Sequence, residues 1–140
     1  MKGNDLTHTI SEDMTVFPGS ETQKLTTKST YEKDGFKETL LQMYSHVGTH
    51  MDPPAHIFTN QKTLDQFSPE QFIDKALVVD CRDLKEGQAI TIDKIDIDKA
   101  KLADFLLFNL GWDKRWNLDT YFNDYPCIDN TVLEFILNSN

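Results

Sequence analysis

The chain has 140 residues, of which 39% are hydrophobic, and this length is enough for one ordinary domain with its own core. It carries 14 basic and 23 acidic side chains, a formal net charge of −9, so phosphate backbones would repel it and no nucleic-acid partner is expected. No apolar run approaches the roughly 20 residues that span a bilayer, so no membrane partner is expected either.

The first half of the chain is predicted to be rich in strands. Residues 5–10 alternate loosely and predict a first strand, which the Phe17-Pro18-Gly19 turn separates from the next. Residues 23–31, rich in Thr and Ser, predict a strand, and Asp34-Gly35 is typical of a hairpin. Residues 36–44 would return as the partner strand and end near Ser45.

The second half mixes short helices with apolar strands. Its predicted elements are a helix opened by Ser68 and Pro69, strands over 76–81 and 90–92, a helix within 93–103, a strand buried on both faces over 105–110, a short helix over 117–122, and a helix over 130–137 capped by Asp129. The last helix would bury Val132, Leu133, Ile136 and Leu137. These elements predict one mixed α/β domain over residues 1–140.

Cysteine usage fits a cytoplasmic protein. The chain has only Cys81 and Cys127, far apart, and Cys81 follows an apolar strand as a small buried residue would. The first residues contain no apolar segment like that of a signal peptide. We therefore expect no disulfide framework and a cytoplasmic location.

Residues 46–56 concentrate the chemistry of the chain. This stretch holds three of the four histidines and one carboxylate, namely His46, His50, Asp52 and His56. Neutral imidazole and carboxylate together suit a divalent cation such as zinc or manganese. The sequence therefore predicts a metal site, with an accidental His-rich surface loop as the alternative; the remaining histidine, His8, is read as structural or solvated.

The local composition favours a loop at this site. Gly48 weakens a helix, and Pro53 biases Asp52 away from helical backbone angles. Pro53 and Pro54 would stiffen the loop, and a stiff loop loses less entropy when its side chains are fixed around an ion.

The motif His-x-Gly-Thr-His-x-Asp-x-Pro-x-His, from His46 to His56, resembles the signature of the cyclase-like metal-dependent hydrolases. That family includes bacterial kynurenine formamidase and isatin hydrolase. Two further segments agree in the same order: residues 5–19 resemble the family's opening strand and Pro-Gly turn, and residues 105–113 resemble a later strand ending in Gly-Trp.

The resemblance implies roles for particular residues. His46, His50 and Asp52 would bind the metal, and His56 would act as the acid–base residue beside it. By the same analogy Phe17 and Trp112 would stack on an aromatic substrate, although both could equally be core aromatics.

The resemblance also implies a fold and an activity. The fold would be the family's swivelling β/β/α arrangement, truncated at the C-terminus, because the family's later His and Glu ligands have no counterpart after residue 56. The activity would be metal-dependent hydrolysis of a non-peptide C–N bond in an aryl formamide or cyclic amide, a small-molecule substrate, by a homo-oligomer. The alternative is a catalytically impaired short form that binds a metal or small molecule, or serves as a subunit.

Overall fold

The computed structural model describes residues 4–139, which divide into two compact units at the boundary between Leu64 and Asp65. None of the helices described in this range is long and apolar enough to cross a membrane. The division concerns contacts within the chain, and a single domain over residues 1–140 stays a prediction.

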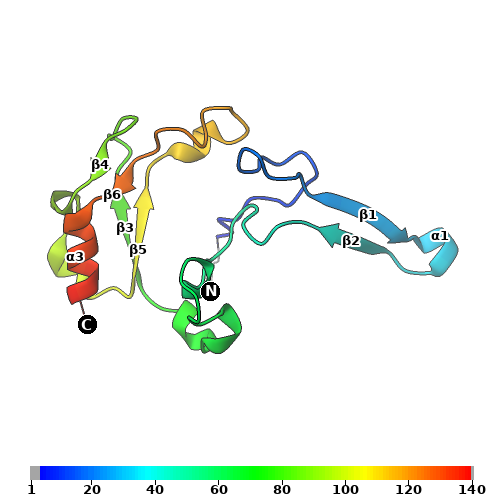
Figure 1. The fold of residues 1–140 in the computed structure, drawn as a ribbon, viewed down its shortest axis with the longest axis horizontal. Helices are drawn as coiled ribbons and strands as arrows, with labels where there is room; N and C mark the ends of the chain where they lie inside the picture. The colour runs from blue at the N-terminus through cyan, green and yellow to red at the C-terminus, as the bar shows by residue number, and fades with distance from the viewer. Residues whose placement is uncertain (1–3, 140) are drawn as a thin grey trace. The chain divides into compact units, whose positions relative to one another are not determined.

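The first unit contains a β-hairpin and the loop that follows it (Figure 1). Strands β1 (Lys24–Ser29) and β2 (Glu38–Gln42) pair antiparallel, as predicted. They are joined by one helical turn, α1 (Tyr31–Asp34), and then by Gly35, whose left-handed φ of 76° ends the turn. The chain then leaves β2, runs through the loop that carries His46, and reaches the 3-10 turn η1 (Pro54–His56).

The second unit is built on two pairs of parallel strands. Strand β3 (Ala76–Asp80) pairs with β5 (Phe105–Asn109), and the short β4 (Ala89–Ile90) pairs with β6 (Cys127–Ile128). Its α-helices are α2 (Ile97–Ala100) and α3 (Asn130–Asn138). Its 3-10 turns are η3 (Pro69–Phe72), η4 (Ile92–Lys94) and η5 (Trp112–Arg115). A further 3-10 turn, η2 (Leu64–Gln66), spans the boundary between the two units.

The core of the second unit lies on one face of the β3–β5 sheet. Its buried members are Val79, Cys81, Ile90, Ile95, Ala100 and Val132. Cys81 is fully buried, as predicted, and burial raises the pKa of its thiol. The opposite face, formed by Val78 and its partner Leu107, is open, so the prediction that the strand over 105–110 is buried on both faces was wrong.

Three elements of the structure differ from the predicted ones, because side-chain hydrogen bonds or backbone angles favour another local conformation. Residues 5–10 form no strand: the N–H of Thr7 donates to Asp5 and that of His8 to Thr49, which leaves no ladder. The helix predicted within 93–103 is reduced to α2, since Asp96 caps it from extended backbone. Residues 117–122 are turns, and Asn117 has a left-handed φ of 64°.

Three smaller details also differ. The extended segment predicted over 90–92 ends early, because Ile92 already begins η4. Ser68 precedes a 3-10 turn, and its hydroxyl bonds Glu70 in place of a backbone N–H. Asp129 caps α3 as predicted, but this helix turns Val132 inward with Phe135 beside it, whereas Leu133, Ile136 and Leu137 are exposed.

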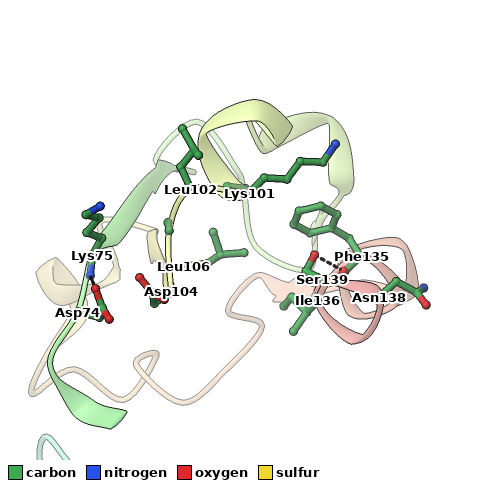
Figure 2. A pocket seen from close by; sticks show the side chains of 12 residues that line it. Asp74, Lys75, Lys101, Leu102, Asp104, Leu106, Phe135, Ile136, Asn138 and Ser139 are labelled. Atoms are coloured by element: carbon green, nitrogen blue, oxygen red, sulfur yellow. Dashed lines mark hydrogen bonds between the residues drawn. The ribbon is translucent and has the colours of Figure 1, made fainter. Parts of the chain in front are cut away.

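An open cavity of about 1080 Å³ lies in the second unit, between the starts of β3 and β5 and the end of α3 (Figure 2). Asp74, Lys75 and Asp104 stand on the strand side, and Phe135 and Ile136 on the helix side. None of the predicted site residues lines this cavity.

Candidate metal centre

Buried apolar side chains help to hold the loop after β2 in place. Val47 of the loop is 6% exposed, and Met14, from the segment before β1, is 4% exposed. Gly48 adopts a left-handed φ of 70°, and a Cβ at this position would lie 2.8 Å from Cε of Met14. Glycine is therefore needed here for both the backbone angle and the close approach.

The N-terminal segment ties into the same loop. The backbone N–H of His8 donates to Oγ1 of Thr49 over 3.1 Å. Gln23 is buried, and its amide donates to the carbonyls of Ser11 and Met14, which holds the segment that carries Met14. Local sequence patterns do not indicate these roles of Gln23 and Met14, because the roles depend on contacts between residues distant in sequence.

His46, His50 and Asp52 converge. Oδ1 of Asp52 lies 2.8 Å from Nδ1 of His46 and 3.5 Å from Nε2 of His50. The two imidazole centroids are 5.1 Å apart, with the rings nearly perpendicular. One ligand atom from each of the three residues falls within 4.8 Å of the other two.

The hydrogen bond of His50 to the backbone orients its ring. Nδ1 of His50 lies 2.9 Å from the carbonyl oxygen of Gly48. Since a carbonyl only accepts, Nδ1 must carry the proton in a neutral ring, and Nε2 keeps its lone pair on the side of Asp52. A backbone carbonyl that fixes the tautomer of a histidine in this way is a common feature of metal sites.

The third histidine of the motif joins the cluster from η1. Its ring centroid lies 4.0 Å from that of His46, with 42° between the ring planes. His56 is exposed and ends η1, whose start is set by Pro54 at its first position. The backbone N–H of His56 donates to the carbonyl of Pro53, so the position of the ring follows from the turn itself.

These residues fit a divalent cation. Two donors each about 2.0–2.2 Å from an ion in a tetrahedral site are about 3.3–3.6 Å apart. The 3.5 Å between Asp52 and His50 matches this spacing, whereas the 2.8 Å between Asp52 and His46 is a hydrogen-bond distance, which would have to lengthen around an ion. Two imidazole nitrogens and a carboxylate oxygen are also the ligand types that zinc and manganese accept. The side chains are 31–47% exposed, so an ion held by them would be accessible to solvent.

The two predicted substrate-binding aromatics lie in different units. Phe17 is 62% exposed in the first unit, where its carbonyl accepts from the N–H of Ser20 in the predicted Pro-Gly turn. Trp112 begins η5 in the second unit, and its indole N–H donates to the carbonyl of Tyr121. The guanidinium of Arg115 lies 4.0 Å from the centroid of the Trp112 ring, so this aromatic has structural partners. A substrate-binding role for Phe17 and Trp112 stays a prediction.

The chain thus has a mixed α/β fold with a cluster of two histidines and one aspartate on the loop after β2. Comparison with known proteins identifies the family to which such a chain belongs. Residues 4–140 match the model of the family called Cyclase, described as "Putative cyclase". The chain therefore belongs to the Cyclase family.

Relatives and solved structures agree with this assignment. An uncharacterized protein of Methanocaldococcus jannaschii is 29% identical over 136 residues, which are 97% of this chain and 62% of that protein. A crystal structure of an isatin hydrolase bound to the product analogue thioisatinate matches with a TM-score of 0.79 at 21% identity, over 97% of this chain and 63% of that one. Isatin hydrolase A from Labrenzia aggregata, bound to benzyl benzoate, matches with a TM-score of 0.76 at 22% identity, over 96% and 62%.

Two conclusions follow from these similarities. The mixed α/β cyclase-like fold predicted from the sequence is confirmed by the likeness to the isatin hydrolases. The chain spans less than two thirds of the length of each of these proteins.

Proposed function

We propose that this chain carries the metal-binding part of a metal-dependent hydrolase that cleaves a non-peptide C–N bond in an aryl formamide or cyclic amide. The observation that carries the proposal is the convergence of His46, His50 and Asp52, whose ligand atoms lie within 4.8 Å of one another. The shared fold of isatin hydrolase supports the substrate class, since isatin is itself a cyclic aryl amide.

The residues of the cluster would have two different roles, metal binding and proton transfer. His46, His50 and Asp52 would hold zinc or manganese, with Nε2 of His50 turned inward by the Gly48 carbonyl. An ion held there would supply Lewis acidity, which would favour loss of a proton from water near neutral pH and polarise a substrate carbonyl. His56, whose ring contacts that of His46, would give a proton to the leaving nitrogen as the C–N bond breaks.

Metal binding is the first test. The chain should bind one Zn²⁺ or Mn²⁺ per cluster in calorimetric titration, and His50→Ala should lower the affinity by at least about 100-fold, because it removes one of three protein ligands. The matched control is His8→Ala, which removes the one histidine outside the motif and leaves the affinity unchanged. Equal affinity in the two variants would contradict the site.

Hydrolysis is the second test, with an aryl formamide and isatin as substrates. His56→Ala should keep the metal affinity and lower the rate of the metal-loaded chain by roughly 10²–10⁴-fold, the usual contribution of a proton-transfer residue. Metal binding without any hydrolysis in the unaltered chain would instead favour the second candidate, a metal-binding domain or subunit.

A further inference from the structure

Gln23 is the one buried polar side chain among the residues that the structure describes, with an exposure of 2%. It lies directly before β1, and its side-chain nitrogen donates to the carbonyl oxygen of Ser11 and, over 3.2 Å, to that of Met14. A carbonyl oxygen only accepts, so the nitrogen of the amide must face the two carbonyls. The orientation of the Gln23 amide is therefore determined by its surroundings.

This orientation leaves the amide oxygen of Gln23 without a donor. Oε1 is buried and has no hydrogen-bond partner among the described residues. A buried acceptor without a partner costs stability, whereas the two donated bonds add to it, so the two effects largely offset each other. Stability alone therefore does not account for a glutamine at this position, and we looked at what its nitrogen holds in place.

The amide of Gln23 holds a turn whose side chain reaches the loop of the metal site. The turn consists of residues 11–14, and a second contact fastens it to β1, since Oε1 of Glu12 accepts from the backbone N–H of Leu25 over 3.0 Å. Met14 ends the turn, and its Cε would lie only 2.8 Å from a Cβ on Gly48. The contact between the turn and the loop is therefore close, and it depends on where the turn is held.

The place of Gln23 in the hairpin connects it to the same loop by a second path. Lys24, the first residue of β1, is the register partner of Gln42, the last residue of β2. The loop that carries the histidines follows directly after Gln42. Gln23 thus lies at the open end of the hairpin, at the point where the N-terminal turn, β1 and the start of the loop are joined.

We propose that Gln23 is a positioning residue for the metal site: by holding Met14 against Gly48, it fixes the spacing of the histidines at positions 46 and 50 before an ion binds. This inference rests on the proposed function, because it concerns an ion that these histidines would hold. A loop that is already fixed loses less conformational entropy when its side chains bind an ion. The contribution of Gln23 is therefore to metal affinity more than to stability.

The first experiment compares stability with metal affinity in two variants. Gln23→Met removes both the donor and the unpaired acceptor but keeps the length and approximate volume of the side chain. The midpoint of its urea unfolding should stay close to that of the unaltered chain, whereas its affinity for Zn²⁺ in calorimetric titration should fall about tenfold, as for other groups that support metal ligands.

Gly35→Ala is the matched control for this variant. It strains the left-handed backbone at the far turn of the same hairpin, where nothing lies within 4 Å of the added Cβ. This control should lower the midpoint of urea unfolding and leave the affinity for Zn²⁺ unchanged, which is the opposite of the result expected for Gln23→Met.

A second experiment reads the loop without any metal, by NMR of the imidazole nitrogens at a pH at which the rings are neutral. Nδ1 of His50 lies 2.9 Å from the carbonyl oxygen of Gly48, which favours the tautomer protonated at Nδ1. In Gln23→Met the loop is released and this bond weakens, so the signals should shift towards an average of the two tautomers. Gly35→Ala should keep the tautomer of the unaltered chain.

Each outcome of the two experiments decides the proposal. Lower affinity and averaged tautomers in Gln23→Met, with the unfolding midpoint kept, support it. Unchanged affinity and an unchanged tautomer overturn it, because the volume of the side chain is then all that the site needs. A midpoint that falls as far as that of Gly35→Ala also overturns it, because Gln23 is then a residue of general stability. If the unaltered chain binds no Zn²⁺, the proposed function fails, and the tautomer of His50 decides whether Gln23 fixes the loop.

Discussion

Gly48 determines the position of the histidines on either side of it, and this makes a first prediction. Gly48→Ala places a side chain in left-handed backbone and brings its Cβ to 2.8 Å from the buried Cε of Met14. We expect a loss of about 2–3 kcal/mol in the free energy of unfolding, of which the backbone angle alone accounts for about 1–2 kcal/mol. Urea denaturation measures this loss, and metal affinity should fall with it.

Gly35→Ala is the control for this variant. Gly35 has a similar φ of 76°, but nothing lies within 4 Å of the Cβ that alanine would add. This variant should therefore show the cost of the backbone angle alone and leave metal affinity unchanged. Equal losses of stability in the two variants would show that Met14 moves aside freely and does not fix the loop.

Asp80 gives a prediction about acid titration. Two nitrogens of Arg82 donate to its carboxylate over 2.8 and 2.6 Å, and the backbone N–H of Arg82 adds a third bond, so the pKa of Asp80 falls from 3.8 to about 2. Because the folded-state pKa is depressed, this carboxylate stabilises the protein above pH 3.8, and the contribution is lost as the pH falls towards 2. The pair is exposed, so its contribution to stability is small.

The titration itself is the sensitive readout of this pair. Arg82→Gln should raise the pKa of Asp80 towards 3.8, as followed by NMR of the carboxyl carbon. Arg115→Gln is the control, since Arg115 pairs with Glu86 and not with Asp80. A pKa of Asp80 that stays near 2 without Arg82 would mean that other donors hold it down.

At this scale the sequence predicted the cluster well, and there is a physical reason. His46, His50, Asp52 and His56 lie within eleven residues, so a turn through Gly48 and Pro53 suffices to bring them together. Met14 could not be found in the same way, because it approaches Gly48 from more than thirty residues upstream, and Gln23 contributes only by holding the segment that carries Met14. The role of each residue in binding an ion stays a prediction.

At the scale of single elements, the N-terminal cap of helix α3 gives a testable prediction about stability. The carboxylate of Asp129 accepts from the backbone N–H groups of Thr131 and Val132, which α3 cannot satisfy within its own first turn. Asp129→Ala should therefore cost about 1 kcal/mol in the free energy of unfolding, within the usual range of 0.5–2 kcal/mol for a lost cap.

The control for this variant removes the same charge from the same helix. Glu134 is exposed on α3, and Glu134→Ala should change stability by less than about 0.5 kcal/mol, as surface substitutions usually do. The pKa of Asp129 is lowered, chiefly by the hydroxyl of Thr131, so the effect of the cap should fade as the pH falls below 3.8. An Asp129→Ala variant as stable as Glu134→Ala would contradict this role.

The elements that sequence predicted correctly have local causes. The hairpin follows from two β-prone runs around Asp34-Gly35, and α3 follows from its cap. The errors are cases in which one residue redirects the backbone, as Asp96 does before α2 and Asn117 does with its left-handed angle. Local propensity is weak enough that a single side-chain bond or backbone angle decides these short segments.

At the scale of the whole molecule, the unexpected feature is how much apolar surface remains open. The run over residues 105–110 predicted a strand buried on both faces, yet Val78 and Leu107 are 59% and 45% exposed on one face of the β3–β5 sheet. Parallel strands are normally covered on both faces. The apolar run of β5 therefore predicted the strand itself, because the run is local, but not the exposure of one face, which depends on what packs against the sheet.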